Sequence, residues 1–462
     1  MNIFNANATC LSAWSTQAEL ATPIYVLDAN SLSEWVDKAS SVAKQWLKQQ
    51  NFKAKPGQYL QVPDAQGHLA AVLFGEDPHD PMAIGALATQ LPSGVYSVAG
   101  LSEIQAFAWA LHAYQFSLYK EISRADAQLF VGDVSWSVAN LKDQISAVAW
   151  GRDLINLPAD DLNPARLAEE ARALASYHEA TLEVIEGQAE LAKHFPAIHA
   201  VGRAADVAPR LIDLRWGDEQ HFAITLVGKG VCFDTGGLNL KNTPGMATMK
   251  KDMGGAAHVL ALAHMIMALK LPVCLRVLVP AVENAIGKGA YRPGDVVRTR
   301  SGKTVEITNT DAEGRMILSD ALTYAQEQTC DWLIDVATLT GAARVALGTD
   351  LPGFFTNSES LSEALVAQSK LQVDPVWRLP LYRPYRGLMD TPIADIKNAS
   401  SQGYGGAITA ALFLQDFVNQ DQVWMHFDLM AANQKTLPGR PEGGEIMGMR
   451  ALLSVIINKV SE

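Results

Sequence analysis

Residues 303–327, KTVEITNTDAEGRMILSDALTYAQE, join a strand pattern to a helix pattern. KTVEIT alternates in the manner of a half-buried strand, whereas MILSDALTYAQE has apolar residues at helical spacing. Asp311 and Glu313 stand at the junction, followed by Gly314 and Arg315. Two acids at one junction repel each other unless positive charge lies nearby. Such a pair of acids therefore needs an explanation from the rest of the sequence.

Strand and helix patterns alternate on both sides of this junction, from about residue 180 to the end of the chain. Strand-like apolar segments lie at 180–187, 210–216, 222–228, 273–282, 332–338 and 423–429. Helical patterns lie at 254–270, 362–370, 407–418 and 449–460. This alternation is typical of a largely parallel central sheet covered by helices on both faces. Ligands bind such sheets at the carboxyl ends of strands, which is where the polar motifs fall.

The amino-terminal part is predicted to be a separate, smaller domain. It contains strand-like segments at 22–28, 69–75 and 93–100 and a helical pattern at 103–120, without a histidine pair or a glycine-rich phosphate loop. A long amphipathic segment then stops before Pro158, because proline disfavours a helical residue ahead of it. Asn163 and Pro164 provide an N-cap and a first helical residue for the next helix.

We therefore predict an α/β protein with two domains. Residues 1–145 form a small amino-terminal α/β domain, and residues 146–162 form a connecting helix and linker. Residues 163–462 form the larger catalytic α/β domain, with a mostly parallel central sheet flanked by helices.

Composition excludes several classes of protein. The chain has 462 residues, 48% hydrophobic and 19% charged, and its net charge of −12 argues against nonspecific nucleic-acid binding. The first 20 residues lack the basic and apolar regions of a signal peptide. The most apolar helical segment, 259–271, contains His264 and is shorter than the ~20 residues that a bilayer requires. Four widely separated cysteines indicate free thiols in a reducing compartment. We expect a cytoplasmic protein without membrane or nucleic-acid partners.

Three segments place acids beside apolar elements. Lys229 and Asp234 follow a strand, and Asp252 precedes a helix. Asp311 and Glu313 are two residues apart, and in extended backbone such side chains point the same way. Taken alone, Asp252 is a suitable helix N-cap, and a lysine between glycines is usually solvated. Together, four carboxylates at one sheet edge would be mutually destabilising without counter-charge.

Two divalent cations would balance the four carboxylates. The ligands are mostly oxygen atoms, which leaves zinc, manganese and magnesium as candidates. Two metals that share carboxylates activate a water molecule between them. Lys229 could join such a site only as a neutral amine. Lowering its pKa from ~10.4 to below ~7 costs roughly 5 kcal/mol, which only a metal bond or burial beside cations supplies.

Four motifs, in this order, resemble those of the leucyl aminopeptidase family of cytosolic dinuclear-metal peptidases. They are VGKGVCFDTGGLNLK (227–241), MKKDMGGAA (249–257), NTDAEGR (309–315) and DVATLTGA (335–342). The similarity covers about residues 150–430 and includes 151–164 and 405–418. The first 140 residues show no such similarity, and RPEGGEIMGMRALL (440–453) departs from the family's pattern of small residues.

The resemblance implies a leucyl aminopeptidase-like metallo-exopeptidase, a hydrolase that removes amino-terminal residues from peptides by metal-activated water. The preferred residues would be apolar, such as leucine, and the peptide would need a free amino terminus. Asp234 and Glu313 match ligands that bridge two divalent metal ions. Asp311 joins them at one metal, while Asp252 and Lys229 complete the other.

The resemblance also assigns roles to residues that bind no metal. Lys241 matches the catalytic lysine, and Arg315 matches the arginine that holds a bicarbonate. Five residues match positions that line the substrate site: Met249, Asn309, Thr338, Leu339 and Gly341. The family implies two zinc, manganese or magnesium ions per chain and a homohexamer.

Two other readings compete with this one. A two-metal phosphoesterase also gathers acids at a sheet edge, but such sites usually include histidines. The four motifs contain none, and the nearest, His258 and His264, lie on the helix after Asp252. A DNA-binding module is the non-enzymatic alternative. The acidic net charge and the lack of a basic, aromatic cluster in the first domain argue against it.

Overall fold

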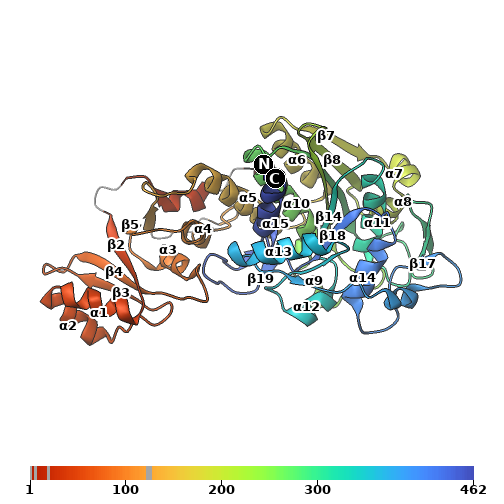
Figure 1. The fold of residues 1–462 in the computed structure, drawn as a ribbon. Helices are drawn as coiled ribbons and strands as arrows, with labels where there is room; N and C mark the ends of the chain where they lie inside the picture. Colours follow the sequence, from red (N-terminus) through yellow and green to blue (C-terminus); the bar gives the residue numbers. More distant parts are fainter. Residues whose placement is uncertain (1–2, 5–7, 18–20, 121–126) are drawn as a thin grey trace. The chain divides into compact units, whose positions relative to one another are not determined.

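The computed structural model describes residues 3–4, 8–17, 21–120 and 127–462 (Figure 1). They form two compact units. The larger contains residues 3–4, Trp150–Gln434 and Gly443–Glu462. The smaller contains residues 8–17, 21–120, 127–149 and Lys435–Glu442. Helix α5 (Val138–Asn156) crosses the division between them. The predicted domain boundaries at residues 145 and 163 stay a prediction.

Residues Lys435–Glu442 lie within the range predicted to be catalytic, yet they group with the smaller unit. The Gly439 amide donates a hydrogen bond to Nδ1 of His112 at 3.3 Å. Gly439 has a φ of +67°, and a Cβ atom there would lie 2.5 Å from Cε of Met82. These contacts join residues more than 300 positions apart, so no local sequence pattern could predict them.

A six-stranded sheet forms the smaller unit, in the order β1-β6-β5-β2-β4-β3. Its neighbouring strands are parallel, except for the antiparallel pair β3 and β4. The strands are β1 (Trp14–Ser15), β2 (Thr22–Leu27), β3 (Tyr59–Pro63), β4 (Leu69–Gly75), β5 (Gly94–Val98) and β6 (Ala127–Phe130). The helices are α1 (Ala29–Lys38), α2 (Ser41–Gln50), α3 (Leu87–Gln90) and α4 (Glu103–His112). Helix α4 is shorter than the predicted 103–120.

The larger unit is built on a nine-stranded sheet, in the order β16-β15-β18-β14-β9-β11-β8-β7, with β10 also paired to β11. The four neighbours β18, β14, β9 and β11 are parallel, while β15, β8 and β7 run antiparallel to their inner neighbours. The strands are β7 (Thr181–Glu186), β8 (Arg210–Trp216), β9 (Phe222–Gly228), β10 (Gly230–Asp234), β11 (Val273–Asn284), β14 (Trp332–Ala337), β15 (Gly353–Thr356), β16 (Trp377–Arg378) and β18 (Val423–Asp428).

Helices cover this sheet (Figure 1). Helix α10 packs on β9 and β14, and α11 packs on β9 and β11. The helices of the unit are α6 (Pro164–Tyr177), α7 (Gln188–His194), α8 (Pro196–Gly202), α9 (Thr243–Met246), α10 (Gly254–Ala268), α11 (Glu313–Ala325), α12 (Gly341–Leu347), α13 (Glu359–Leu371), α14 (Gly406–Gln415) and α15 (Met449–Ser461). The predicted α/β fold, with a smaller α/β part and a mostly parallel central sheet in the larger part, is confirmed.

Short strands complete the architecture. They are β12 (Val296–Arg298), β13 (Thr304–Glu306), β17 (Ile396–Lys397), β19 (Ala432–Asn433) and β20 (Gly443–Gly444). Within the described ranges, no helix has the length and apolar character needed to cross a membrane. The four cysteines form no disulfide, as predicted, and Cys274 is less deeply buried than the other three.

Candidate metal centre

Four neighbouring parallel strands end at one edge of the large sheet. Lys229 follows β9, Thr338 follows β14, and Asn284 and Asp428 are the last residues of β11 and β18. The Lys229 amide donates to the carbonyl of Val336 at 3.0 Å, which continues the sheet pairing past β9. These residues therefore share the edge at which parallel sheets bind ligands.

The Lys229 ammonium group lies among three acceptors. Nζ is 2.9 Å from Oδ2 of Asp252 and 2.9 Å from Oε1 of Glu313. It also donates to the carbonyl of Thr338 at 3.1 Å. The Thr338 hydroxyl donates to Oδ1 of Asp252 at 2.8 Å. All four residues are buried, so the lysine balances acid charge that water cannot reach.

Lys241 plays the same part for the other two acids. Its Nζ lies 2.8 Å from Oδ2 of Asp234 and 2.5 Å from Oδ1 of Asp311. Oδ1 of Asp234 accepts hydrogen bonds from the Gly236 amide and from Nδ2 of Asn284, each at 2.8 Å. The two lysines thus supply the positive charge that the acids of the motifs require.

Thr310 holds the two acidic loops together. Its hydroxyl donates to the carbonyl of Gly236 at 2.6 Å and accepts from the Asn239 amide at 2.8 Å. Its carbonyl accepts hydrogen bonds from the Tyr291 hydroxyl at 2.7 Å and from Nδ2 of Asn284 at 3.1 Å. The loop after Asp234 is therefore fixed against the residue that precedes Asp311.

Two motif glycines are required by the close approach of Lys229. A Cβ atom on Gly314 would lie 2.6 Å from Cε and 2.8 Å from Nζ of Lys229. A Cβ atom on Gly255 would lie 2.7 Å from the Lys229 amide nitrogen and 2.1 Å from the carbonyl oxygen of Val336. Side chains at these positions would displace the lysine from its acids.

Asp311 and Glu313 do not converge in the way that the sequence predicted. Asp311 lies in a turn, and Glu313 is the first residue of α11, so the backbone between them is not extended. Asp252 lies in a 3₁₀ helix (Met249–Met253), and no side chain caps α10 after it. The N-cap role that Asp252 could have had on sequence grounds is therefore absent.

The acids present fit a hard divalent cation. Asp234, Asp252 and Glu313 are buried, and one ligand oxygen from each lies within 4.8 Å of the others. Oε2 of Glu313 and Oδ1 of Asn284 are buried without a hydrogen-bond partner among the residues that the structure describes. Asp311 lies outside this group of three and joins it through Lys241. A carboxylate set with unused oxygens is suited to zinc, manganese or magnesium.

Burial and mutual repulsion raise the pKa values of two of these acids. Burial and the nearby Asp234 raise the pKa of Glu313 to about 8, and burial and the nearby Asp252 raise the pKa of Asp234 to about 6. Burial also acts against ionisation of Asp252, but the Lys229 ammonium outweighs it and lowers the pKa of that carboxyl.

The two lysines respond in the opposite sense. Burial disfavours each ammonium, but the surrounding carboxylates outweigh it and raise the pKa values of Lys229 and Lys241. Both are therefore charged in this structure. The neutral amine that the resemblance implies at position 229 requires a bound dication to displace the proton.

Arg315 lies on the first turn of α11, beneath the same edge of the sheet. Its Nη1 donates to the carbonyl of Asn398 at 2.5 Å, while its Nε is buried without a hydrogen-bond partner in the described residues. The guanidinium lies 6.0 Å from the ring centroid of Phe413. Burial lowers the pKa of Arg315 to about 10, so the group stays charged at neutral pH.

Three of the five residues assigned to the substrate site, Met249, Asn309 and Thr338, adjoin or contact the acids. Met249 is buried in the 3₁₀ helix that contains Asp252. Oδ1 of Asn309 accepts a hydrogen bond from the Asp311 amide at 2.9 Å. Thr338 contacts Asp252. Leu339 follows Thr338 in the same loop, and Gly341 is the first residue of α12. Among these five residues, and within the described part of the chain, only Thr338 forms a hydrogen bond to the side chain of a candidate metal ligand.

Several supporting residues were missed by sequence reasoning: Asn284, Tyr291, Thr310 and Asp428. Asn284 and Asp428 end apolar strands, so polar residues at the last positions of the strand patterns were the available signal. Tyr291 lies in an irregular segment, and nothing local indicates that its hydroxyl reaches Thr310.

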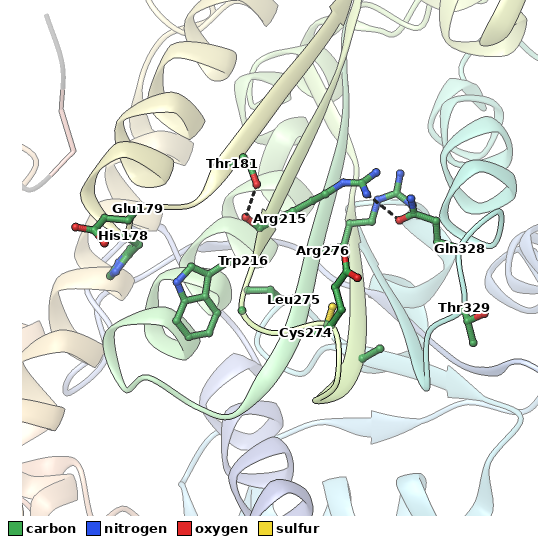
Figure 2. A pocket seen from close by; sticks show the side chains of 13 residues that line it. His178, Glu179, Thr181, Arg215, Trp216, Cys274, Leu275, Arg276, Gln328 and Thr329 are labelled. Atoms are coloured by element: carbon green, nitrogen blue, oxygen red, sulfur yellow. Dashed lines mark hydrogen bonds between the residues drawn. The ribbon is translucent and has the colours of Figure 1, made fainter.

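A cavity of about 710 Å³ lies at the other end of the strands, where β9 and β11 begin (Figure 2). Its lining includes Arg215 and Arg276, which both bind the buried carboxylate of Asp213. None of the motif residues lines this cavity, and its arginines already have a shared acid partner. The candidate chemistry therefore belongs to the acidic edge and not to this cavity.

Both parts of the chain resemble known proteins. Residues 149–453 match the catalytic domain of the cytosol aminopeptidase family, and residues 22–132 match the N-terminal domain of M17 aminopeptidases. The four motifs revealed no similarity in the amino-terminal part, and the match over residues 22–132 supplies it.

Similar proteins include a probable cytosol aminopeptidase of Roseiflexus castenholzii, 44% identical over 66% of this chain and 63% of the relative. The chain thus spans less than two thirds of that relative's length. A probable cytosol aminopeptidase of Geotalea uraniireducens is 38% identical over 81% of each chain.

Two solved structures share the fold. The cytosol aminopeptidase from Coxiella burnetii is 45% identical, with a TM-score of 0.92 over 96% of this chain and 98% of the other. The bottromycin maturation enzyme BotP in complex with Mn is 32% identical, with a TM-score of 0.84 over 95% and 99% of the two chains.

Proposed function

The chain belongs to the cytosol aminopeptidase family, and we propose that it is a metal-dependent aminopeptidase that removes amino-terminal residues from peptides. The observation that carries this proposal is the buried group of Asp234, Asp252 and Glu313 beside Lys229. A phosphoesterase reading is weaker, because no histidine belongs to this group in the described part of the chain.

Asp234, Asp252, Glu313 and Asp311 would hold two divalent cations, with Lys229 as a neutral fifth ligand. Bound there, the cations supply Lewis acidity toward the scissile carbonyl and lower the pKa of a water molecule. Zinc or manganese suits this oxygen-rich set, and magnesium is a further candidate. The manganese with which BotP forms its complex supports a metal of this class.

Lys241 would act as an ammonium group that donates hydrogen bonds to the oxygen on which negative charge develops. Its pKa, raised by Asp234 and Asp311, keeps it protonated. Lys229 and Lys241 thus need opposite protonation states in the working enzyme, although both are charged in this structure. The protonation states of the two lysines would differ because only Lys229 would contact a cation directly.

Arg315 would hold a bicarbonate that accepts and returns a proton near the reacting bond. A planar guanidinium meets two oxygens of such an anion at once. The buried Nε without a partner supports this role, because a buried donor without an acceptor is costly.

The substrate would be a peptide with a free amino terminus, and its first side chain would be apolar, such as leucine. Met249 and Leu339 supply apolar surface beside Asp252 and Thr338. The names of the relatives support a cytoplasmic location.

A homohexamer is proposed as the assembly. Large apolar side chains of the catalytic unit are more than half exposed in the single chain: Leu240, Val345, Trp377, Tyr382, Ile393 and Tyr404. Where exposed apolar groups lie together in one patch, they favour burial against further copies of the chain. The native mass, measured by light scattering, tests this assembly, and a monomeric mass would reject it.

The activity is tested by hydrolysis of leucine p-nitroanilide after metal removal and after addition of zinc, manganese or magnesium. The N-acetylated substrate and p-nitrophenyl phosphate are the controls. An aminopeptidase requires the free amine, so it should cleave neither of them. Asp234→Ala should lose both metals by elemental analysis. Cleavage of the phosphate ester in place of the anilide would reject the proposal, and a gel shift at physiological salt checks the DNA-binding alternative.

A further inference from the structure

The loop between β14 and α12 is anchored by a carboxylate from the neighbouring strand β18. Oδ1 of Asp428 accepts hydrogen bonds from the backbone amides of Leu339 and Thr340, both at 3.0 Å. Oδ2 accepts from the Thr340 hydroxyl at 2.5 Å. Asp428 is 1% exposed, so these three donors provide its stabilisation in place of water.

The anchored loop contains Thr338, which contacts both Lys229 and Asp252. Thr338 immediately precedes Leu339, and its hydroxyl donates to Oδ1 of Asp252 at 2.8 Å. Its carbonyl accepts from Nζ of Lys229 at 3.1 Å. A shift of the loop would therefore move the partner of Lys229 and Asp252 without touching Asp234 or Asp311.

A second group of buried polar side chains lies near Asp428. His426 lies two residues earlier on β18, on the same face of the strand, and its Nδ1 is 2.6 Å from Oδ1 of Asp335. Oδ2 of Asp335 accepts from Nε1 of Trp424 at 2.7 Å. Burial disfavours the charged imidazole, but Asp335 and Asp428 outweigh it and raise the pKa of His426. The two buried carboxylates, of Asp335 and Asp428, thus favour a positive charge on the His426 imidazole.

We propose that Asp428 is a positioning residue, which fixes the Thr338–Thr340 loop and through Thr338 orients Lys229 and Asp252 for metal and substrate. The proposal rests on the proposed aminopeptidase function. It assigns Asp428 no contact with substrate. Replacing a group that hydrogen-bonds a metal ligand typically changes metal affinity or activity by about 10- to 100-fold, and Asp428 acts on such a group, Thr338.

Asp374 provides a matched control within the same unit. It is also buried, and its carboxylate accepts three backbone hydrogen bonds, from the amides of Gly448, Arg450 and Ala451. It holds the start of α15 and has no hydrogen bond described to any candidate metal ligand. Asp374→Asn and Asp428→Asn therefore make the same chemical change, an amide in place of a carboxylate beneath three donors.

The experiment compares the full-length chain with these two variants. In Asp428→Asn, we expect one of two manganese sites to weaken about 10- to 100-fold, measured by titration of the metal-free protein, and kcat/KM to fall by a similar factor. In Asp374→Asn, we expect both quantities to stay within about twofold of the parent. Thr340→Val removes the hydroxyl contact to Oδ2 and also the acceptor for the Ala343 amide at the start of α12. It should shift metal affinity in the same direction by less.

Hydrogen exchange of the peptide that spans residues 337–343 separates this inference from the proposed function. We expect faster exchange in Asp428→Asn than in the parent or in Asp374→Asn, with or without metal. Equal exchange, or equal losses of metal affinity in the two Asn variants, would overturn the positioning role. If the parent bound no dication and cleaved no anilide, the proposed function would fail, and the exchange result would still judge the role of Asp428 in holding the loop.

Discussion

Replacing Lys229 by methionine tests the electrostatic account of the candidate metal centre. The change keeps an unbranched apolar chain in the buried space but removes the ammonium that lies 2.9 Å from both Asp252 and Glu313. In the metal-free protein, these acids would then lack the cation that now lies between them. The structure therefore predicts that the metal-free variant is much less stable than the metal-free parent.

Two estimates of this loss agree. Removing one partner of a buried ion pair costs about 3–5 kcal/mol, because the other charge stays buried. Alternatively, Asp252 takes up a proton. Its ordinary pKa is 3.8, so neutralising it at pH 7 costs about 4 kcal/mol, at roughly 1.4 kcal/mol per pH unit. For a unit of this size, about 4 kcal/mol lowers the melting temperature by about 8 °C.

The assay is thermal unfolding at pH 7 after metal removal, with Lys251→Met as the control. Lys251 is equally buried, but burial lowers its pKa to about 8, so its charge is unfavourable in the folded chain. Its replacement should leave the melting temperature unchanged or raise it. Saturating zinc or manganese should then restore much of the stability of Lys229→Met, because a dication supplies the missing charge.

A metal-free Lys229→Met protein that melts within about 2 °C of the parent, the smallest shift expected per kcal/mol for a unit of this size, would refute this reasoning. It would mean that the acids are balanced by something other than the Lys229 ammonium. A loss that metal does not reverse at all would indicate damaged packing and not missing charge.

Three further outcomes are expected. Lys241→Ala should lower kcat about 10²- to 10³-fold in steady-state assays with two metals per chain retained by elemental analysis, and near-normal turnover would reject its role. Arg315→Ala should lose less activity and recover part of it in concentrated bicarbonate, whereas a parent enzyme indifferent to bicarbonate in the same assay would count against that anion. The metal-free parent should become less stable as the pH rises from about 4.5 to about 8, because Glu313, with its pKa raised from 4.5 to about 8, holds a proton in the folded chain that the unfolded chain has released. Chemical denaturation across this range should show a slope of about 1.4 kcal/mol per pH unit for that proton, and stability that rises with pH would contradict the assignment.

The sequence predicted the sheet well because its central strands are continuous apolar segments. The strands at 210–216 and 222–228 are found at those residues as β8 and β9. The helix predicted at 103–120 ends at His112, because periodicity signals where a helix can form and not where tertiary packing stops it. Strand β10 has only five residues, and pairing with β11 defines it more than its own pattern does.

Only part of the candidate site could be predicted from the sequence. The acids and lysines stand in short motifs with unusual residue combinations, so chemistry alone marks them. Their partners carry no such mark. Thr310 is an ordinary threonine until its hydroxyl meets Gly236 and Asn239, and Asp428 is one of many aspartates until β18 is placed beside β14.

By itself, the sequence determined the residue types that meet at the site, the alternation of strands and helices, and the excess of acid that demands a cation. The tertiary structure decided which lysine balances which acid: Lys229 with Asp252 and Glu313, and Lys241 with Asp234 and Asp311. The physical reason is that charge pairing falls off over a few ångströms, whereas these residues are up to 84 positions apart in the chain, which is the difference between 313 and 229. The order of the strands, together with the loops and helices that follow them, brings these residues within that distance.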